Sequence, residues 1–425
     1  MIRNADRRQR RYRYAVPALM SVALLLLAAC SSSSKNSAGG NPSGTSAPGS
    51  GSGSTATTSG SDIKVMVIAP FTLAVAPAKA NYDAVRIEAD LQNAKGGING
   101  HKIDVIGCDD QTDPNVGAKC AQQAVSDHVV AVLGEFSLVS SVIWPIITAA
   151  GIPSIGLVQY GPSDQTASAA WPITPPVVVA EGSATGYLAK RKGCKAIADA
   201  QADAGANSKV PVQLNKLAAA VGGAKYVGPF LLPATGSLAN APAIAKSITS
   251  KADCANIADG ENGIQLMKAI LQLNPNFKFA TNAQSVPGDW PTELGSEASA
   301  LTVIGGVAPD TSSSPGVQSY LSEMKAKASS DVLSDISKQA WASFYAFEQV
   351  ASTIKGDITA KSLTQALGQA SDVTTEGMTG TINYTQPAPM AAITRMFSTE
   401  LFVMRAQNGK VVQIGTADAK DYLSS

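Results

Sequence analysis

From residue 63 onward, short apolar runs alternate with longer stretches in which apolar residues recur at helical spacing. Four runs have the length and the β-branched content of buried strands: residues 63–69, 101–107, 129–133 and 152–157. Three intervening stretches have the period of helices: residues 82–93, 115–127 and 140–150. Strands that alternate with helices in this way form a parallel sheet, so this half predicts a doubly wound α/β unit.

The same alternation restarts after residue 194. Strands are predicted at 195–200, 226–231, 255–258, 277–281 and 303–307, with helices at 210–221, 241–251 and 263–273. The chain then continues with helices at 317–327, 337–355 and 359–370, and with strand-like segments at 380–384, 399–405 and 410–415. Because the late helices bring no strands of their own, we infer that the chain crosses back to cover the first unit.

The first 29 residues predict export. Six arginines lie in residues 3–13, and the apolar run that follows, residues 15–29, is too short to span a bilayer. The run ends in Leu27-Ala28-Ala29-Cys30, which resembles the bacterial lipobox, whose cysteine is acylated. We predict a lipoprotein signal peptide over 1–29 and a lipid anchor on Cys30 at the outer face of the cell membrane. An ordinary secretory signal beside a chance cysteine is the alternative.

Residues 30–61 are almost entirely Ser, Gly, Ala, Thr, Pro and Asn after the cysteine. Such a segment has too little apolar surface to bury, so we predict a disordered tether with a reach of ~30 Å. Lys and Arg total 33 against 32 for Asp and Glu, and with six arginines in the leader the rest of the chain is mildly acidic. This balance argues against a nucleic-acid partner, which needs a basic face.

The chain has only two histidines, His101 and His128, which excludes a multi-His metal site. It also has no P-loop, no GxSxG and no HExxH motif. We therefore expect no enzyme, no metal and no cofactor. A pair of catalytic carboxylates stays open as the alternative, because Asp and Glu are abundant.

Four cysteines follow Cys30: Cys108, Cys120, Cys194 and Cys254. An even number in an exported protein indicates two disulfides, with three possible pairings. Their order along the chain favours Cys108–Cys120 and Cys194–Cys254, and buried free thiols are the alternative. No CxxC spacing is present, which argues against zinc.

Four motifs of the first unit identify a family. They are residues 93–103 (NAKGGINGHKI), 109–114 (DDQTDP), 130–134 (VAVLG) and 151–153 (GIP). In this order and spacing they resemble the leucine/isoleucine/valine-binding protein family, the type I periplasmic-type solute-binding proteins of ABC importers. Weaker similarities follow at 341–350, 376–380 and 408–410. Each motif also has a plain structural role, such as glycines that end a helix or the Asp113-Pro114 pair that starts one.

The resemblance implies two doubly wound, Rossmann-like lobes joined by three crossover segments. Lobe 1 would comprise residues 62–176 plus 309–375, and lobe 2 residues 177–308 plus 376–425. The implied function is to capture a small polar or amino-acid-like solute between the lobes and deliver it to the permease of an ABC importer. We expect a monomer. The alternative is a ligand-sensing module of the same fold that reports to a membrane receptor.

Ligands of open parallel sheets lie at the carboxyl ends of the strands, so the loops there supply the candidate binding residues. In lobe 1 these are Phe71, Thr72, Glu135, Phe136, Ser137, Gln159 and Tyr160; in lobe 2 they are Asp203, Asp259, Glu261 and Gln284.

Some positions depart from the amino-acid binders of the family. Leu138 and Val139 interrupt its serines, and Ala204-Gly205 replaces its Tyr-Gly step, which argues against an ordinary branched-chain amino acid. The three aromatic candidates could instead be core residues, Ser137 a helix cap, and the acids of lobe 2 solvated loop residues. Trp290 could be either a wall of the site or a surface anchor.

Overall fold

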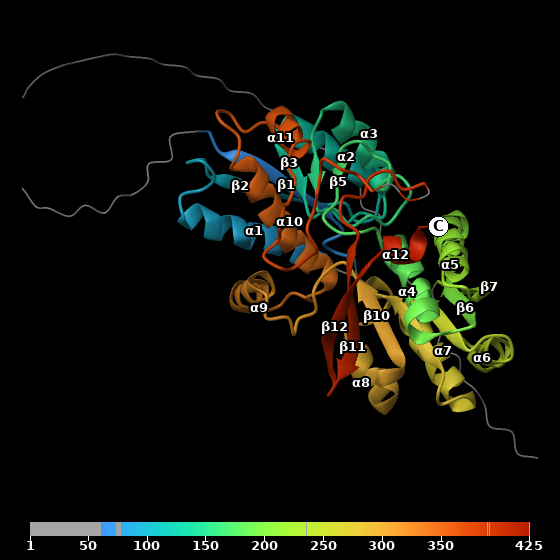
Figure 1. Ribbon diagram of the computed structural model, residues 1–425. Coiled ribbons are helices and arrows are strands. Elements are labelled where there is room, and N and C mark those ends of the chain that lie inside the picture. The colour runs from blue at the N-terminus through green and yellow to red at the C-terminus, as the bar shows by residue number, and fades with distance from the viewer. Residues whose placement is uncertain (1–60, 74–77, 235, 389, 391, 425) are drawn as a thin grey trace, which may run out of the picture. The chain divides into compact units, whose positions relative to one another are not determined.

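The computed structural model describes residues 61–73, 78–234, 236–388, 390 and 392–424 (Figure 1). The predicted signal peptide, the predicted lipidation site Cys30 and the predicted tether up to residue 60 lie outside these residues. In the described part, no helix combines the length and the apolar character that crossing a bilayer would require.

Five parallel strands form the first sheet in the order β2-β1-β3-β4-β5. They are β1 (Ile63–Ala69), β2 (Ile103–Asp109), β3 (Ala131–Leu133), β4 (Ser154–Ile155) and β5 (Ala170–Trp171). The helices that accompany them are α1 (Lys79–Ala94), α2 (Pro114–Ser126) and α3 (Ser140–Ala149).

The alternation of side chains along β1 places an apolar layer on each face of this sheet. Val65 and Val67 belong to the cluster that includes residues of α1, whereas Met66 and Ile68 pack with residues of α2 and α3. Both faces of the sheet are therefore covered, as a parallel sheet requires.

The second sheet has the order β12-β11-β10-β9-β8-β6-β7; β11 pairs antiparallel with both β10 and β12, and the other neighbouring strands are parallel. Its strands are β6 (Ala196–Ala202), β7 (Lys225–Leu232), β8 (Cys254–Ala258), β9 (Lys278–Asn282), β10 (Leu301–Gly305), β11 (Glu400–Gln407) and β12 (Lys410–Asp418). One face packs against α4 (Val177–Lys192), α5 (Lys209–Val221) and α12 (Lys420–Leu423). The other packs against α6 (Ala241–Thr249) and α7 (Gly260–Leu273), and the short α8 (Trp290–Leu294) contacts α7.

The last long helices return to the first sheet, as the sequence predicts. These are α9 (Pro315–Lys327), α10 (Asp335–Ala351) and α11 (Ala360–Leu367). Both α9 and α10 contact α1, and in Figure 1 the orange α10 lies beside the blue α1. The chain therefore passes between the sheets three times, which confirms two doubly wound lobes joined by three crossovers. We call the first sheet with its helices lobe 1 and the second sheet with its helices lobe 2.

Local signals explain why these elements begin and end where they do. Asp113 accepts hydrogen bonds from the backbone N–H groups of Asn115 and Val116, so it caps α2 as expected. Gly97 follows α1 with φ of 75°, and a Cβ there would lie 1.9 Å from the carbonyl oxygen of His101. Only glycine fits this turn.

Three expectations were wrong. The strand expected at 152–157 is only Ser154–Ile155, because Gly156 takes φ of 71° and ends it. Residues 380–384 form no strand: Ile382 makes one isolated bridge with Val373, and this stretch belongs to a crossover. Trp290, expected at the surface or the site, is 3% exposed and lies in the core.

Both disulfides are present, in the pairing that the order of the cysteines favours. Cys108–Cys120 links β2 to α2, and Cys194–Cys254 links the approach to β6 with the first residue of β8. The second bond is possible because β6 and β8 are neighbours, with Ile197 beside Cys254. Each lobe therefore has one covalent link.

Candidate ligand-binding site

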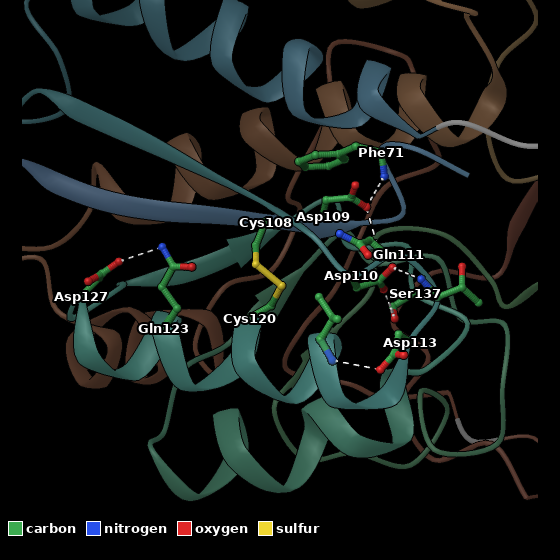
Figure 2. The surroundings of a disulfide bond; sticks show 12 residues. Phe71, Cys108, Asp109, Asp110, Gln111, Asp113, Cys120, Gln123, Asp127 and Ser137 are labelled. Atoms are coloured by element: carbon green, nitrogen blue, oxygen red, sulfur yellow. Dashed lines mark hydrogen bonds between the residues drawn. A yellow bond between two sulfur atoms is a disulfide. The ribbon is translucent and has the colours of Figure 1, made fainter. Parts of the chain in front are cut away.

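The loop after β1 is tied to the end of β2 by one carboxylate (Figure 2). Asp109 accepts hydrogen bonds from the Phe71 N–H (2.9 Å), the Thr72 hydroxyl (2.6 Å) and the Gln111 N–H (3.0 Å). Phe71 is half-buried, whereas Thr72 is exposed. Because the Thr72 hydroxyl donates its proton to Asp109, it faces any ligand as an acceptor.

Residues 134–137 of the loop after β3 are buried, and Ser137 among them forms a second hydroxyl–carboxylate pair, with Asp110 after β2. Ser137 donates to the carboxylate of Asp110 over 2.5 Å, and burial raises the pKa of Asp110. Ser137 caps no helix, because α3 begins at Ser140 without a side-chain cap. Phe136 is 8% exposed and packs in an apolar cluster with Val158.

Glu135 belongs to the same loop and is 2% exposed. It accepts a hydrogen bond from the Ser154 hydroxyl at 2.8 Å, and its other oxygen has no protein partner in the described part of the chain. Burial raises the pKa of Glu135 to about 8, and the nearby Asp164 carboxylate adds to the effect. At pH 7 this side chain is mostly a neutral acid.

The loop after β4 is organised by Asp164. One carboxylate oxygen accepts from the Ser140 hydroxyl (2.5 Å) and the Trp144 indole (2.8 Å), and the other from the N–H groups of Tyr160 (3.0 Å) and Gly161 (2.7 Å). Four donors make this a closed hydrogen-bond network. Asp164 shapes the loop and leaves the Tyr160 side chain 52% exposed.

Gln159 connects this loop to the third crossover. Its amide donates to the Asp164 carbonyl at 2.7 Å and to the Arg395 carbonyl at 2.9 Å. Its own carbonyl oxygen is buried without a partner among the described residues. The side chain is 2% exposed. Its NH2 group therefore holds the loop in place, whereas its carbonyl oxygen makes no hydrogen bond with the described residues.

The carboxyl edge of lobe 2 contains a row of polar side chains on adjacent strands. Gln201 on β6 lies beside Ala258 on β8, the residue before Asp259, and Asn282 ends β9 beside Ile304 on β10. Gln201 is 3% exposed and Asn282 is fully buried. The sequence indicates these two positions only as parts of strand-end loops, and burial is what singles them out.

Polar atoms in and beside this row find no hydrogen-bond partner among the described residues. They are Gln201 Nε2, Asp259 Oδ2, Thr281 Oγ1, Asn282 Oδ1 and Gln284 Oε1. Nearly all buried polar atoms in proteins are paired, so an unpaired group at the ligand-binding edge of a parallel sheet is suited to receive a ligand.

The predicted acids of lobe 2 differ in their surroundings. Asp203 and Glu261 are exposed, and Asp203 accepts from the N–H of Gly205 at 3.0 Å in a local turn. Asp259 is half-buried at the N-terminal end of α7, yet its side chain caps no backbone N–H. Burial raises the pKa of Asp259 to about 6. Of the three acids, Asp259 is the one that is half-buried and has a carboxylate oxygen without a hydrogen-bond partner among the described residues.

The described residues at the two edges do not form a metal-ligand cluster. Among the residues that the structure describes, no group of three or more His, Cys, Asp and Glu side chains could hold a metal ion. What the edges offer is hydrogen-bonding atoms, mainly acceptors, beside an apolar cluster. They are suited to reversible binding of a small organic solute.

A family model described as "Periplasmic binding protein" matches residues 62–410 of the chain. This match confirms the resemblance drawn from the motifs of the first lobe, and it places the chain among binding proteins rather than enzymes. No curated protein shows significant similarity in sequence.

Solved structures share the fold at low sequence identity. An ABC transporter substrate-binding protein from Aeropyrum pernix is 17% identical, with a TM-score of 0.69, covering 86% of this chain and 99% of its own. A branched-chain amino acid transporter binding protein from Streptococcus pneumoniae, in complex with isoleucine, is 17% identical, with a TM-score of 0.66 and coverages of 84% and 99%. A solute-binding protein from R. palustris in complex with benzoate is 16% identical, with a TM-score of 0.64 and coverages of 84% and 96%.

Proposed function

We propose, on the premise that this chain belongs to the periplasmic binding protein family, that it is an extracytoplasmic solute-binding lipoprotein of an ABC importer. It captures one small solute between its two lobes and delivers it to the permease. The row of unpaired polar atoms at the carboxyl edge of lobe 2 carries this proposal. The similar fold of the Aeropyrum pernix transporter protein supports the link to an importer.

The mechanism that we propose is closure of the lobes on the solute. Lobe 1 comprises residues 62–176 plus 309–375, and lobe 2 residues 177–308 plus 376–425. The three crossovers act as the hinge. A solute that contacts both edges stabilises the closed form, and it shifts the equilibrium only by its higher affinity for that form. The permease then recognises the closed, monomeric protein.

The anchor is the second part of the proposal. Residues 1–29 are removed on export, and Cys30 carries the lipid that holds the protein at the outer face of the membrane. The segment 30–61 allows the two lobes to reach a permease ~30 Å from the anchor. A Cys30→Ser variant should be released from the membrane, as measured by immunoblotting of membrane and medium fractions. Retention of this variant in the membrane would contradict the lipid anchor.

Uptake tests the transport function directly. Deleting the gene should abolish uptake of the solute that raises the thermal midpoint of the exported chain, and the wild-type gene should restore it. If the deletion leaves uptake intact but removes a cellular response to the same solute, the protein is instead a sensing module.

A further inference from the structure

Three hydroxyl groups at the carboxyl edge of lobe 1 already donate their protons to aspartates of the same lobe. Thr72 donates to Asp109 at 2.6 Å, Ser137 to Asp110 at 2.5 Å and Ser140 to Asp164 at 2.5 Å. A hydroxyl has only one proton, so these three side chains can meet a ligand only as acceptors, and Ser137 already accepts from the Val139 N–H at 3.2 Å. A carboxylate on the ligand would need the same hydroxyl protons that Asp109, Asp110 and Asp164 already accept.

In the part of the chain that the structure describes, Asp109, Asp110 and Asp164 have no cationic partner. Every ion pair among the described residues joins other acids, namely Asp83, Asp90, Asp310, Glu323, Asp331 and Asp335. Asp109, Asp110 and Asp164 are held by hydroxyl, indole and backbone donors alone. The charge at this edge is therefore stabilised but not neutralised, and a second anion close to it would be repelled.

Asp259 places an uncompensated carboxylate on the other lobe. It follows Ala258, which lies beside Gln201 on β6, and Asn282 ends the neighbouring strand β9. Among the described residues the Gln201 donor Nε2 and the Asn282 acceptor Oδ1 have no partner. One oxygen of Asp259 is likewise unpaired, although the residue begins a helix whose N–H groups it could have capped. This carboxylate is available to a ligand from lobe 2.

Apolar side chains accompany the polar groups of lobe 1. Phe136 and Val158 form a small cluster in lobe 1, with Phe71 packed against it and Val177, the first residue of α4, closing it. The rings of Phe71 and Tyr82 lie 5.8 Å apart. An apolar part of a solute would find contacts here, and the exposed ring of Tyr160 could accept a cation on its face.

We infer that the solute is an organic amine: an ammonium group on an apolar skeleton, without a carboxylate. The inference rests on the proposed function and narrows its ligand. The ammonium group donates up to three hydrogen bonds and needs acceptors, which both edges supply. An amino acid would bring the same ammonium group together with a carboxylate. That carboxylate would meet hydroxyls whose protons are already donated to aspartates, and it would be repelled by carboxylates that have no positive partner in the described part of the chain.

Matched solutes that differ only in charge test this inference. The exported chain is titrated at pH 7 with 3-methylbutylamine, 3-methylbutanol and 3-methylbutanoate, and with benzylamine, benzyl alcohol and benzoate, each to ~10 mM. At least one amine should raise the thermal midpoint and bind ~10-fold or more tightly than its alcohol and its carboxylate. Calorimetric titration gives the affinities.

Two outcomes would overturn the inference. If a carboxylate or an alcohol binds as tightly as its amine, the inference fails and the proposed function stands. If none of the six solutes shifts the midpoint, the amine class is also wrong for this site. The proposed transport function fails as well only if deleting the gene leaves all solute uptake unchanged. The failure of the amine inference and the failure of the transport function can therefore be told apart.

A single substitution sharpens the test. Asp259→Asn keeps the size of the side chain and removes its charge, so it should weaken binding of the amine ~10-fold or more. Asp104→Asn, which changes an exposed aspartate on β2, is the matched control and should bind like the wild type. Equal affinity for the amine in Asp259→Asn, with an unchanged unfolding midpoint, would show that Asp259 does not contact the ammonium group.

Discussion

The carboxyl edges of the two lobes use their polar side chains in opposite ways. In lobe 1, three aspartates receive donors from their own lobe: three reach Asp109, two reach Asp110 and four reach Asp164. In lobe 2, Gln201, Asp259 and Asn282 each leave an atom without a partner among the described residues. The aspartates of lobe 1 are satisfied within the fold, although Glu135 and Gln159 at the same edge each keep one oxygen unpaired among the described residues. In lobe 2 it is the acid and the two amides at the strand ends that have capacity left for a ligand.

This difference separates stability from binding. Groups that are satisfied within the fold contribute to the free energy of unfolding, and their loss leaves buried donors unpaired. Groups that are unsatisfied cost free energy in the folded state and recover it when a ligand pairs them. Substitutions in lobe 1 should therefore mainly change stability, and those in lobe 2 mainly affinity.

The largest expected effect comes from the disulfides, which also differ between the lobes. Cys194–Cys254 closes a separation of 60 residues, and Cys108–Cys120 one of 12. From the loss of loop-closure entropy in the unfolded chain, removal should cost ~4 kcal/mol in lobe 2 and ~3 kcal/mol in lobe 1. Urea unfolding of the two double-alanine variants measures both. An equal or larger cost for the lobe 1 bond would contradict this order.

Asp164 should show the next largest effect, and it tests whether lobe 1 is completed by its own hydrogen bonds. Asp164→Ala leaves four donors without an acceptor, including the buried Trp144 indole, so the free energy of unfolding should fall by ~3 kcal/mol. Asp164→Asn keeps an acceptor oxygen and should lose less. Urea unfolding at pH 7 measures both, and a loss under ~1 kcal/mol for the alanine variant would show that the network is not stabilising.

Two fully buried glutamates, one chosen from each lobe, test the pH dependence of stability. Burial raises the pKa of Glu135 to about 8, and burial with the Asp199 carboxylate raises that of Glu181 to about 8. The folded state then binds more protons than the unfolded state between about pH 5 and pH 8, so stability falls as pH rises through this window. Each residue should account for roughly 2 kcal/mol of the decrease.

Unfolding curves at pH 5 and pH 8 check this expectation. Glu135→Gln and Glu181→Gln keep the oxygens that accept from Ser154 and Asn215, and each should flatten the dependence. Glu323→Gln is the control, because its carboxylate is partly exposed and pairs with Lys327. Stability that rises between these two pH values would contradict the raised pKa values.

The fold could be predicted because its signals are local. The period of apolar residues separates strands from helices, and the Asp113 cap and the Gly97 turn act within a few residues. The strand at 152–157 was overestimated because its end depends on Gly156, where a Cβ would lie 2.3 Å from the Cβ of Ser343. That contact joins distant parts of the sequence, and no local pattern shows it.

The candidate site could be predicted only as a set of loops. The carboxyl ends of the strands indicate Ser137 and Gln159, but not that Ser137 donates to Asp110 or that Gln159 binds the Arg395 carbonyl 236 positions away. The sequence indicates Gln284 in this loop, whereas Asn282 is the more buried of the two, and burial rather than residue type distinguishes them. The partner of each polar group is a tertiary property.

The smallest expected effect is the one that most directly separates the two edges. Asp259 is half-buried without a counter-charge, and burial raises its pKa to about 6, so its charge opposes folding as pH rises above about 4. Asp259→Asn should leave the free energy of unfolding unchanged or raise it by up to ~1 kcal/mol at pH 8, after allowance for solvent screening, and by less at pH 4. Urea unfolding of the ligand-free chain at both pH values measures this. A loss of stability like that of Asp164→Ala would mean that the edge of lobe 2 is also completed by folding, and the contrast between the lobes would fail.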